Sequence, residues 1–225
     1  MLPIELSGTF ILPIWLDLVA TFCFALTGGI VAMKRGYDVV GVMALALLTG
    51  LGGGLIRDGI FIQQGPPALT TDSRYIQVAV IGALVGALMG DRVRYFRRII
   101  AGIDAVGLGA YAVFGTQKSL AAGLSEPAAI LVGVINAAGG GLLRDVITNE
   151  EPLVFRPGQF YVLVALAAAG LFVVATLHLG WPPRASALAI IGLTFVFRVL
   201  TILFNWKTAA LAPPPTVPTP PSKLS

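Results

Sequence analysis

Charged residues are scarce in this chain of 225 residues, and their scarcity excludes most soluble proteins. Only 12% of the residues are Asp, Glu, Lys or Arg, against about 25% in an ordinary soluble domain. Hydrophobic residues make up 56% of the chain, and the mean hydropathy is +0.88. Such a chain has too few polar side chains to cover its surface in water, so the composition predicts an integral membrane protein.

Cysteine and histidine are almost absent, since Cys23 and His178 are the single residues of each type. One cysteine can form neither an internal disulfide nor a thiolate metal site. A lone histidine near the end of an apolar segment is not expected to be a metal ligand. No nucleophile stands in a pattern with a base. We therefore expect no enzyme, no bound metal and no cofactor.

Seven apolar segments are present, and they predict an all-α fold of seven transmembrane helices. Residues 1–13 form a short N-terminal segment, 91–100 a basic loop, and 206–225 a proline-rich tail that we expect to be disordered. The predicted helices cover residues 14–33, 39–63, 74–90, 99–117, 127–148, 158–178 and 185–205.

The basic residues stand mainly between these segments. Their placement in the loops indicates how the chain is oriented in the membrane, so the net charge of +4 does not point to nucleic-acid binding. One side of the membrane would hold three of them and the other side nine, which places the N-terminus outside and the C-terminus in the cytoplasm of a cell inner membrane. The three are Arg74, Lys118 and Arg184; the nine are Lys34, Arg35, Arg92, Arg94, Arg97, Arg98, Arg156, Lys207 and Lys223.

A seven-residue motif occurs twice, as GGGLIRD at residues 52–58 and as GGGLLRD at residues 139–145. The offset is 139 − 52 = 87 residues, and it also aligns Asp17 with Asp104. The repeats, 14–90 and 101–178, each hold three predicted helices. Because three is odd, the second repeat must be inverted relative to the first, with the helix over 185–205 as an addition. Inverted repeats of this kind are common in transport proteins.

The glycine triplets are expected to weaken the second and fifth helices. Each glycine in a helix costs about 1 kcal/mol relative to alanine, so three together favour a kink or an unwound turn. Irregular backbone at membrane depth must face protein or water, which would place both triplets along an internal polar path. The alternative is that the triplets only allow helices to pack closely. The six glycines are Gly52, Gly53, Gly54, Gly139, Gly140 and Gly141.

Charged residues inside the predicted spans are expected to face the interior, because charge in lipid is costly. We expect two ion pairs, one toward each end of a single water path, formed by Asp17 with Arg57 and by Asp104 with Arg144. Asp58 and Asp145 follow the two arginines directly. Structural locks that line no path would have the same sequence pattern, so both interpretations stay open.

Three other features lie in the spans. Lys118 ends the fourth helix, where its ammonium would either plug a pore mouth or extend to the membrane interface. Arg198 is expected to extend to the interface or to a helix contact. Two consecutive G-x-x-x-G steps, at Gly82, Gly86 and Gly90, predict a close-packing face within the subunit or between subunits.

The doubled motif and the string GTQKSLAAG at residues 115–123 resemble the prokaryotic branch of the trimeric intracellular cation (TRIC) channel family, over about residues 15 to 205. The resemblance implies a homotrimer with one pore in each subunit, conducting potassium and also sodium. It further implies that the second and fifth helices kink around that pore, and that Lys118 is linked to gating. Animal members have a Lys-Glu-Val motif with a lipid-binding role; here KSL stands in its place, so the resemblance does not extend to that regulation.

Two other functions remain open. Members of this domain family are also described as glycine transporters, which predicts a secondary carrier for a small amino acid instead of a channel. A structural or lipid-organising membrane protein is the third possibility. The partners we expect are copies of the chain itself and membrane lipids.

Overall fold

The computed structural model describes residues 11–89, 97–155, 160–204 and 206, and every regular element among them is helical. Seven long helices match the seven predicted spans. Two of them end in π-helical turns, and a one-turn helix, α3, precedes the third span. The helices are α1 (Trp15–Lys34), α2 (Val39–Ile56) with η2 (Arg57–Ile62), α3 (Ala68–Thr71), α4 (Arg74–Met89), α5 (Arg97–Ala121), α6 (Glu126–Ile147), α7 (Tyr161–Val173) with η4 (Val174–His178), and α8 (Pro183–Leu203).

Most of these helices are suited to a bilayer by length and composition. Five of them are at least 18 residues long and apolar enough to cross a membrane: α1, α2 with η2, α6, α7 with η4, and α8. Helix α4 is apolar but shorter, and α5 is 25 residues long and has Asp104 and Lys118 among its residues. The predicted all-helical membrane fold is therefore confirmed.

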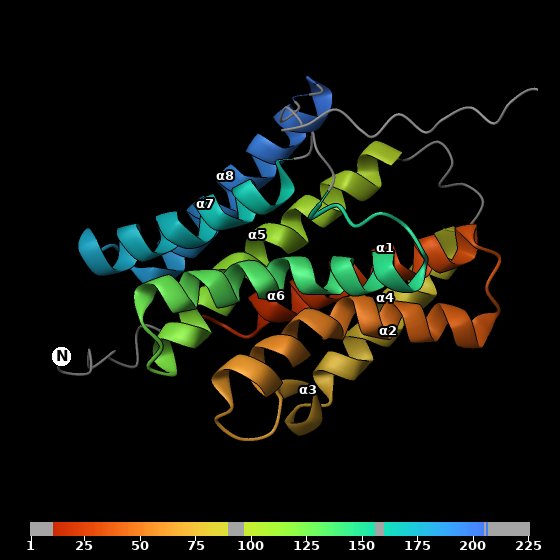
Figure 1. The fold of residues 1–225 in the computed structure, drawn as a ribbon, viewed down its shortest axis with the longest axis horizontal. Helices are drawn as coiled ribbons and strands as arrows, with labels where there is room; N and C mark the ends of the chain where they lie inside the picture. The colour runs from red at the N-terminus through yellow and green to blue at the C-terminus, as the bar shows by residue number, and fades with distance from the viewer. Residues whose placement is uncertain (1–10, 90–96, 156–159, 205, 207–225) are drawn as a thin grey trace, which may run out of the picture.

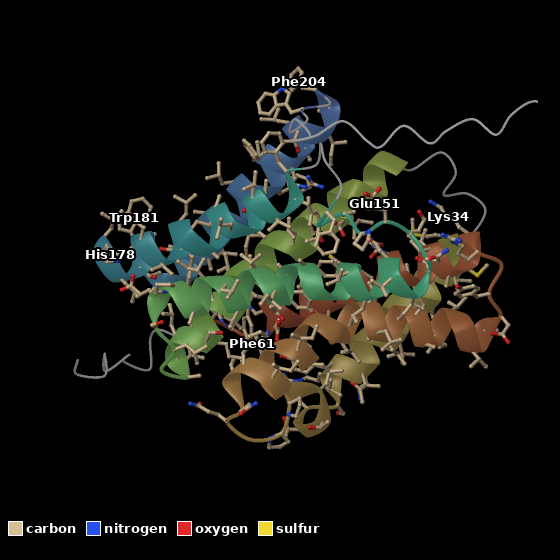
Figure 2. The ribbon with its side chains drawn as sticks, viewed as in Figure 1. Lys34, Phe61, Glu151, His178, Trp181 and Phe204 are labelled. Carbon is tan, nitrogen blue, oxygen red and sulfur yellow. The ribbon has the colours of Figure 1, made fainter. Side chains whose placement is uncertain are left out.

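The helices lie side by side in one bundle (Figure 1). Helix α1 packs against α2, α4 and α5, and α6 lies between α2 and α5. Helices α7 and α8 contact each other and cover α5. In Figure 2, His178 and Trp181 mark one end of the bundle, and Lys34 and Glu151 mark the opposite end. We call these ends the Lys118 face, where α1 begins and α5 ends, and the Lys34 face, where α1 ends and α6 ends.

Side chains at the helix ends fix several of the boundaries. Asp38 accepts a hydrogen bond from the Gly41 amide at 2.8 Å and so caps the start of α2. Gly36, with φ of +71°, makes the turn between α1 and α2, a conformation that glycine adopts without strain. An ion pair between Arg35 and Glu150 ties the end of α1 to the segment after α6.

The glycine triplets lie inside continuous helices, so neither forms the unwound turn, one of the two expected outcomes; the kink stays a prediction. Helix α2 runs without interruption through Gly52–Gly54, and α6 through Gly139–Gly141. In the first half, the chain changes to the π-helical turn η2 at Arg57, within the motif but after its glycine triplet. Tertiary packing accounts for the difference, because contacts across the bundle stabilise a helix more strongly than local propensity weakens it.

Those contacts are made where α2 crosses α6. A Cβ at Gly53 would overlap the backbone oxygen of Asn136, and a Cβ at Gly140 would overlap the backbone oxygen of Thr49. The two contacts are related by the repeat offset, since 53 + 87 = 140 and 49 + 87 = 136. The crossing is therefore symmetric between the halves, and the triplets act there as close-packing residues.

The glycines of α4 also form a packing face. A Cβ at Gly82 would lie 3.0 Å from the backbone oxygen of Phe22, and one at Gly86 would lie 2.7 Å from that of Leu26. Both contacts are with α1 of the same chain, so the predicted close-packing face lies within the subunit. Gly90, the third residue of that prediction, lies outside the described residues.

Candidate functional site

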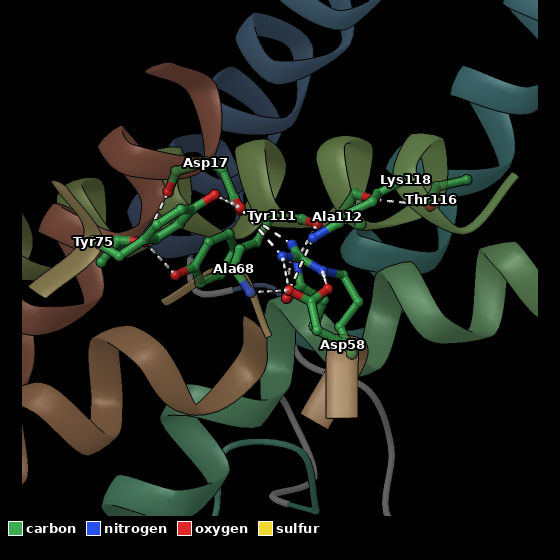
Figure 3. Close-up of polar contacts among 12 residues, drawn as sticks. Asp17, Asp58, Ala68, Tyr75, Tyr111, Ala112, Thr116 and Lys118 are labelled. Carbon is green, nitrogen blue, oxygen red and sulfur yellow. Dashed lines mark hydrogen bonds and ion pairs between the residues drawn. The ribbon is translucent and has the colours of Figure 1, made fainter. Parts of the chain in front are cut away.

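A buried group of charges lies toward the Lys118 face, where α1, η2, α4 and α5 come together. We call it the Asp17 cluster, formed by Asp17, Arg57, Asp58, Tyr75 and Lys118 (Figure 3). Asp17 enters from the first turn of α1, the adjacent residues Arg57 and Asp58 from the start of η2, Tyr75 from the start of α4 and Lys118 from the last turn of α5.

Arg57 is the centre of this cluster and is only 1% exposed. Its Nη1 and Nη2 donate to the two carboxylate oxygens of Asp17 at 3.2 and 3.3 Å. Its Nε donates to Asp58 Oδ1 at 2.7 Å. The predicted pair of Asp17 with Arg57 is confirmed, in the bidentate geometry that arginine forms with a carboxylate.

Asp58 joins this pair to the surface. Its Oδ2 accepts from Lys118 Nζ at 2.8 Å and from the Ala68 amide at 3.1 Å. The Lys118 side chain is 32% exposed, whereas that of Asp58 is 6% exposed. The charges therefore alternate inward from the Lys118 face in the order Lys118, Asp58, Arg57, Asp17.

Hydroxyl and amide groups that sequence reasoning missed complete the surroundings. Tyr75 donates to Asp17 Oδ2 at 2.6 Å, and the Tyr111 hydroxyl bonds Thr21 Oγ1 at 2.8 Å. Asn136 lies 3.5 Å from Arg57 Nη1 through its side-chain oxygen and donates to the Tyr111 backbone oxygen at 2.8 Å. The only sequence signal for these residues was their position as polar side chains inside apolar segments.

Two cavities meet at Asp58. The outer one, which we call the vestibule, has a volume of about 200 Å³ and is lined by Asp58, Ile62, Gln64, Gly65, Pro66, Lys118, Ala121 and Ala122. The inner one measures about 10 Å³ and lies against Asp17, Arg57, Tyr75 and Tyr111. A cavity of that size holds about one water molecule. Asp58 therefore lies between a roomy vestibule and a small cavity at the Asp17–Arg57 pair.

An exposed ion pair lies at the same face, outside the spans. Arg74 donates to Asp72 through Nε and Nη2, the latter at 2.7 Å. These hydrogen bonds lower the pKa of the Asp72 carboxyl, which therefore stays ionised near the start of α4.

A second group of charges lies toward the Lys34 face. We call it the Asp104 cluster, formed by Asp104, Arg144, Asp145, Tyr161 and Arg198. Here Arg144 donates from Nε to Asp145 Oδ1 at 2.9 Å and from Nη1 to Thr27 Oγ1 at 3.3 Å. Asp145 in turn accepts from the Leu153 amide at 3.2 Å, as Asp58 does from Ala68 in the first half.

The predicted ion pair of Asp104 with Arg144 is not formed. No ion pair within 4.0 Å joins the two residues, although each acts electrostatically on the other. The adjacent Asp145 and the Thr27 hydroxyl occupy the Arg144 guanidinium instead. The two halves therefore share the adjacent Arg-Asp contact but differ in the partner of the first-helix aspartate.

Of the two expectations for Arg198, the structure bears out the helix contact. The side chain is 3% exposed and so does not extend to the interface. Its guanidinium carbon lies 5.3 Å from the centre of the Tyr161 ring, within cation–π range. Because α8 lies outside the repeats, the sequence repeat gave no reason to place a charge here.

Comparison with known proteins agrees with this two-fold arrangement. A family model described as "Glycine transporter" matches the chain twice, over residues 14–91 and 102–176. The chain belongs to the glycine-transporter family. The two matches cover the two predicted repeats and leave out α8.

Other members of the glycine-transporter family are membrane proteins of bacteria. A UPF0126 membrane protein of Deinococcus radiodurans is 35% identical over 157 residues, which are 69% of this chain and 73% of that protein. The UPF0126 membrane protein YvgT of Bacillus subtilis is 32% identical, over 85% of this chain and 93% of the relative. The UPF0126 inner membrane protein YadS of Escherichia coli is 29% identical, over 88% and 95%.

Solved structures of TRIC channels have the same fold as this family member. A TRIC cation channel is 28% identical with a TM-score of 0.78, over 91% of this chain and 99% of the channel. The TRIC trimeric intracellular cation channel orthologue from Rhodobacter sphaeroides is 31% identical with a TM-score of 0.75, over 85% and 97%. These likenesses confirm the resemblance to prokaryotic TRIC channels, and they agree with the expectation that the chain is not an enzyme.

Proposed function

We propose that this protein is a channel for monovalent cations, potassium and also sodium, with one conduction path in each subunit. The path enters at the vestibule, passes Lys118, Asp58 and the Asp17–Arg57 pair, and continues along α2 and α6, beside their crossing, toward the Asp104 cluster. The glycines of the two triplets keep the two helices close at that crossing.

The observation that carries the proposal is the buried series of alternating charges behind an open vestibule. Charges inside a membrane protein are costly and occur mainly along ion and substrate paths. Four charged residues in contact at the base of a cavity of about 200 Å³ are more than a single structural lock requires. The likeness to TRIC cation channels at 28 and 31% identity supports the same reading.

On this proposal, the conformation is that of a closed channel. The cavity of about 10 Å³ beside Arg57 leaves no room for a hydrated ion, and Arg57 and Lys118 both place positive charge on the path. Opening then requires that Lys118 leave Asp58 and that the Asp17–Arg57 pair separate or shift.

Planar-bilayer recording of the purified protein tests the proposal. We expect discrete unitary currents whose reversal potential in a potassium gradient follows potassium, with sodium also permeant. A protein that produces no currents under any applied voltage, in bilayers where a control channel is active, would contradict it.

The alternative is a secondary transporter for a small amino acid such as glycine. The family description favours it, as does the inverted repeat, which also occurs in carriers with alternating access. Uptake of labelled glycine into liposomes separates the two functions. Saturable uptake without unitary currents would favour the carrier.

We further propose that the chain forms a homotrimer in the bacterial inner membrane, with the Lys118 face outside and the C-terminus in the cytoplasm. The trimer is supported by the likeness to TRIC trimeric channels, the location by the inner membrane protein YadS. The orientation is supported by the excess of Lys and Arg assigned to the Lys34 face.

A further inference from the structure

The Asp104 cluster differs from the Asp17 cluster in one respect that the repeat does not account for. Asp17 is held by two hydrogen bonds from Arg57 and one from Tyr75. Asp104 is only 6% exposed, yet no hydrogen bond within 3.5 Å or ion pair within 4.0 Å from the described part of the chain reaches its carboxylate, although the Tyr161 hydroxyl acts on it as a nearby donor. Its repeat-related arginine, Arg144, is occupied by Asp145 and Thr27.

Arg198 adds a second positive charge near Asp104, from outside the repeat. Helices α5 and α8 are in close contact, because a Cβ at Gly109 would lie 3.1 Å from the Thr194 side chain. The two helices run in opposite directions, so Asp104, five residues before Gly109, lies at the level of Arg198, one turn after Thr194. Arg144 has the larger electrostatic effect on Asp104, and Arg198 has the next largest.

Two buried polar atoms of the cluster also lack partners. Among the described residues, neither Arg198 Nε nor the Tyr161 hydroxyl has a hydrogen-bond partner within 3.5 Å. The Tyr161 hydroxyl interacts electrostatically with Asp104, and the Tyr161 ring lies against the Arg198 guanidinium. Buried polar groups without partners are rare in folded proteins and call for an explanation.

We propose that Arg198 is a second counter-charge of Asp104, besides Arg144, and that it adjusts the electrostatic potential of the Lys34-side half of the path. This inference rests on the proposed function in one respect, the effect on ion conduction. A fixed cation at this depth opposes the passage of potassium, and Asp104 offsets it; Tyr161 holds the guanidinium beside the carboxylate. The added helix α8 thereby controls conduction in one half of a molecule that is otherwise built from two similar halves.

Unitary conductance tests the effect on ions, measured at low ionic strength, where charge is least screened. We expect R198Q to raise the potassium conductance about twofold and D104N to lower it by a similar factor. R198K keeps the charge and should resemble the wild type. R184Q is the matched control, because it removes the same charge from an exposed position on the same helix, and it should change conductance less than R198Q does.

A thermal double-mutant cycle in detergent tests the pairing independently of conduction. D104N and R198Q should each lower the Tm. If the residues pair, the sum of these two losses should exceed the loss in the double variant by about 3 °C or more. Additive losses would overturn the pairing, whether or not the protein conducts.

If the wild type conducts and R198Q has the same conductance as R184Q, the role in conduction is overturned, and the pair is a structural contact. A wild type without currents would contradict the proposed channel, while the cycle would still decide the pairing.

Discussion

Arg57 shows how a single buried side chain can organise a whole site. Its guanidinium contacts two carboxylates and an amide oxygen, and it lies 5.5 Å from the centre of the Phe114 ring. A buried ion pair of this kind is not a large net source of stability, because both charges lose their hydration. Removing one partner, however, leaves the others buried and uncompensated.

Arg57→Gln should therefore lower the free energy of unfolding by about 3–5 kcal/mol. The measurement is thermal unfolding of the purified protein in detergent. Arg74→Gln, which breaks the exposed pair with Asp72, is the control and should unfold close to the wild type. The reversed pair Asp17→Arg/Arg57→Asp should recover part of the loss; no recovery would mean that the two residues do not act as a pair.

Lys118→Gln should raise the unitary potassium conductance about twofold, because it removes a positive charge from the base of the vestibule. Single-channel recording measures the change, and Lys118→Arg, which keeps the charge next to Asp58, should conduct like the wild type. Equal conductance in both variants would assign Lys118 to the membrane interface alone.

At the scale of the elements, the sequence predicted the seven long helices, and the Asp17–Arg57 pair followed from charge and depth alone. The predictions from sequence failed where tertiary contacts determine the local structure. The free-energy cost of three glycines applies to an isolated helix. In the bundle, the α2–α6 crossing has no room for a Cβ at positions 53 and 140, so glycine is required there. The proposed partnership of Asp104 with Arg198 could not be predicted from the sequence, because it depends on the packing of α8 on α5.

Gly53→Ala and Gly140→Ala should each destabilise the protein by about 1–3 kcal/mol, because the added methyl group would overlap a backbone oxygen. Gly54→Ala is the matched control. Its Cβ would lie 3.7 Å from the Arg57 Nη2, an ordinary contact, so the gain in helix propensity should stabilise α2 by up to about 1 kcal/mol. Thermal unfolding distinguishes the variants, and equal losses at all three sites would favour a hinge over a packing contact.

The whole molecule combines two related halves with one unrelated helix. Exposed apolar side chains cover the outer surfaces of α4 and α8, among them Ile81, Leu84, Leu88 and Leu193. In a bilayer such surfaces contact lipid tails or other subunits. The state of assembly and the orientation are therefore properties that a single chain does not display.

Light scattering of the detergent-solubilised protein should give a protein mass three times that of the 23.5 kDa chain. Cross-linking in native membranes should trap the same species before solubilisation. A monomeric mass in several mild detergents, without cross-linked trimer in membranes, would contradict the proposed assembly.

Cysteine labelling should establish the orientation. In a Cys23→Ala background, Ser73→Cys at the Lys118 face should react with a membrane-impermeant thiol reagent in intact cells. Tyr37→Cys, at the Lys34 face, should react only after the membrane is permeabilised. The opposite pattern would invert the proposed topology.

The symmetric crossing of α2 and α6 also bears on how such a molecule can originate. Gly53 meets Asn136 and Gly140 meets Thr49, at positions equivalent by the offset of 87 residues. A single three-helix polypeptide that paired with an inverted copy of itself would gain both contacts from one glycine. Gene duplication and fusion of that antiparallel dimer would keep the crossing, after which the two copies could diverge. Helix α8, with Arg198 beside only one of them, is then a later addition that ended their equivalence.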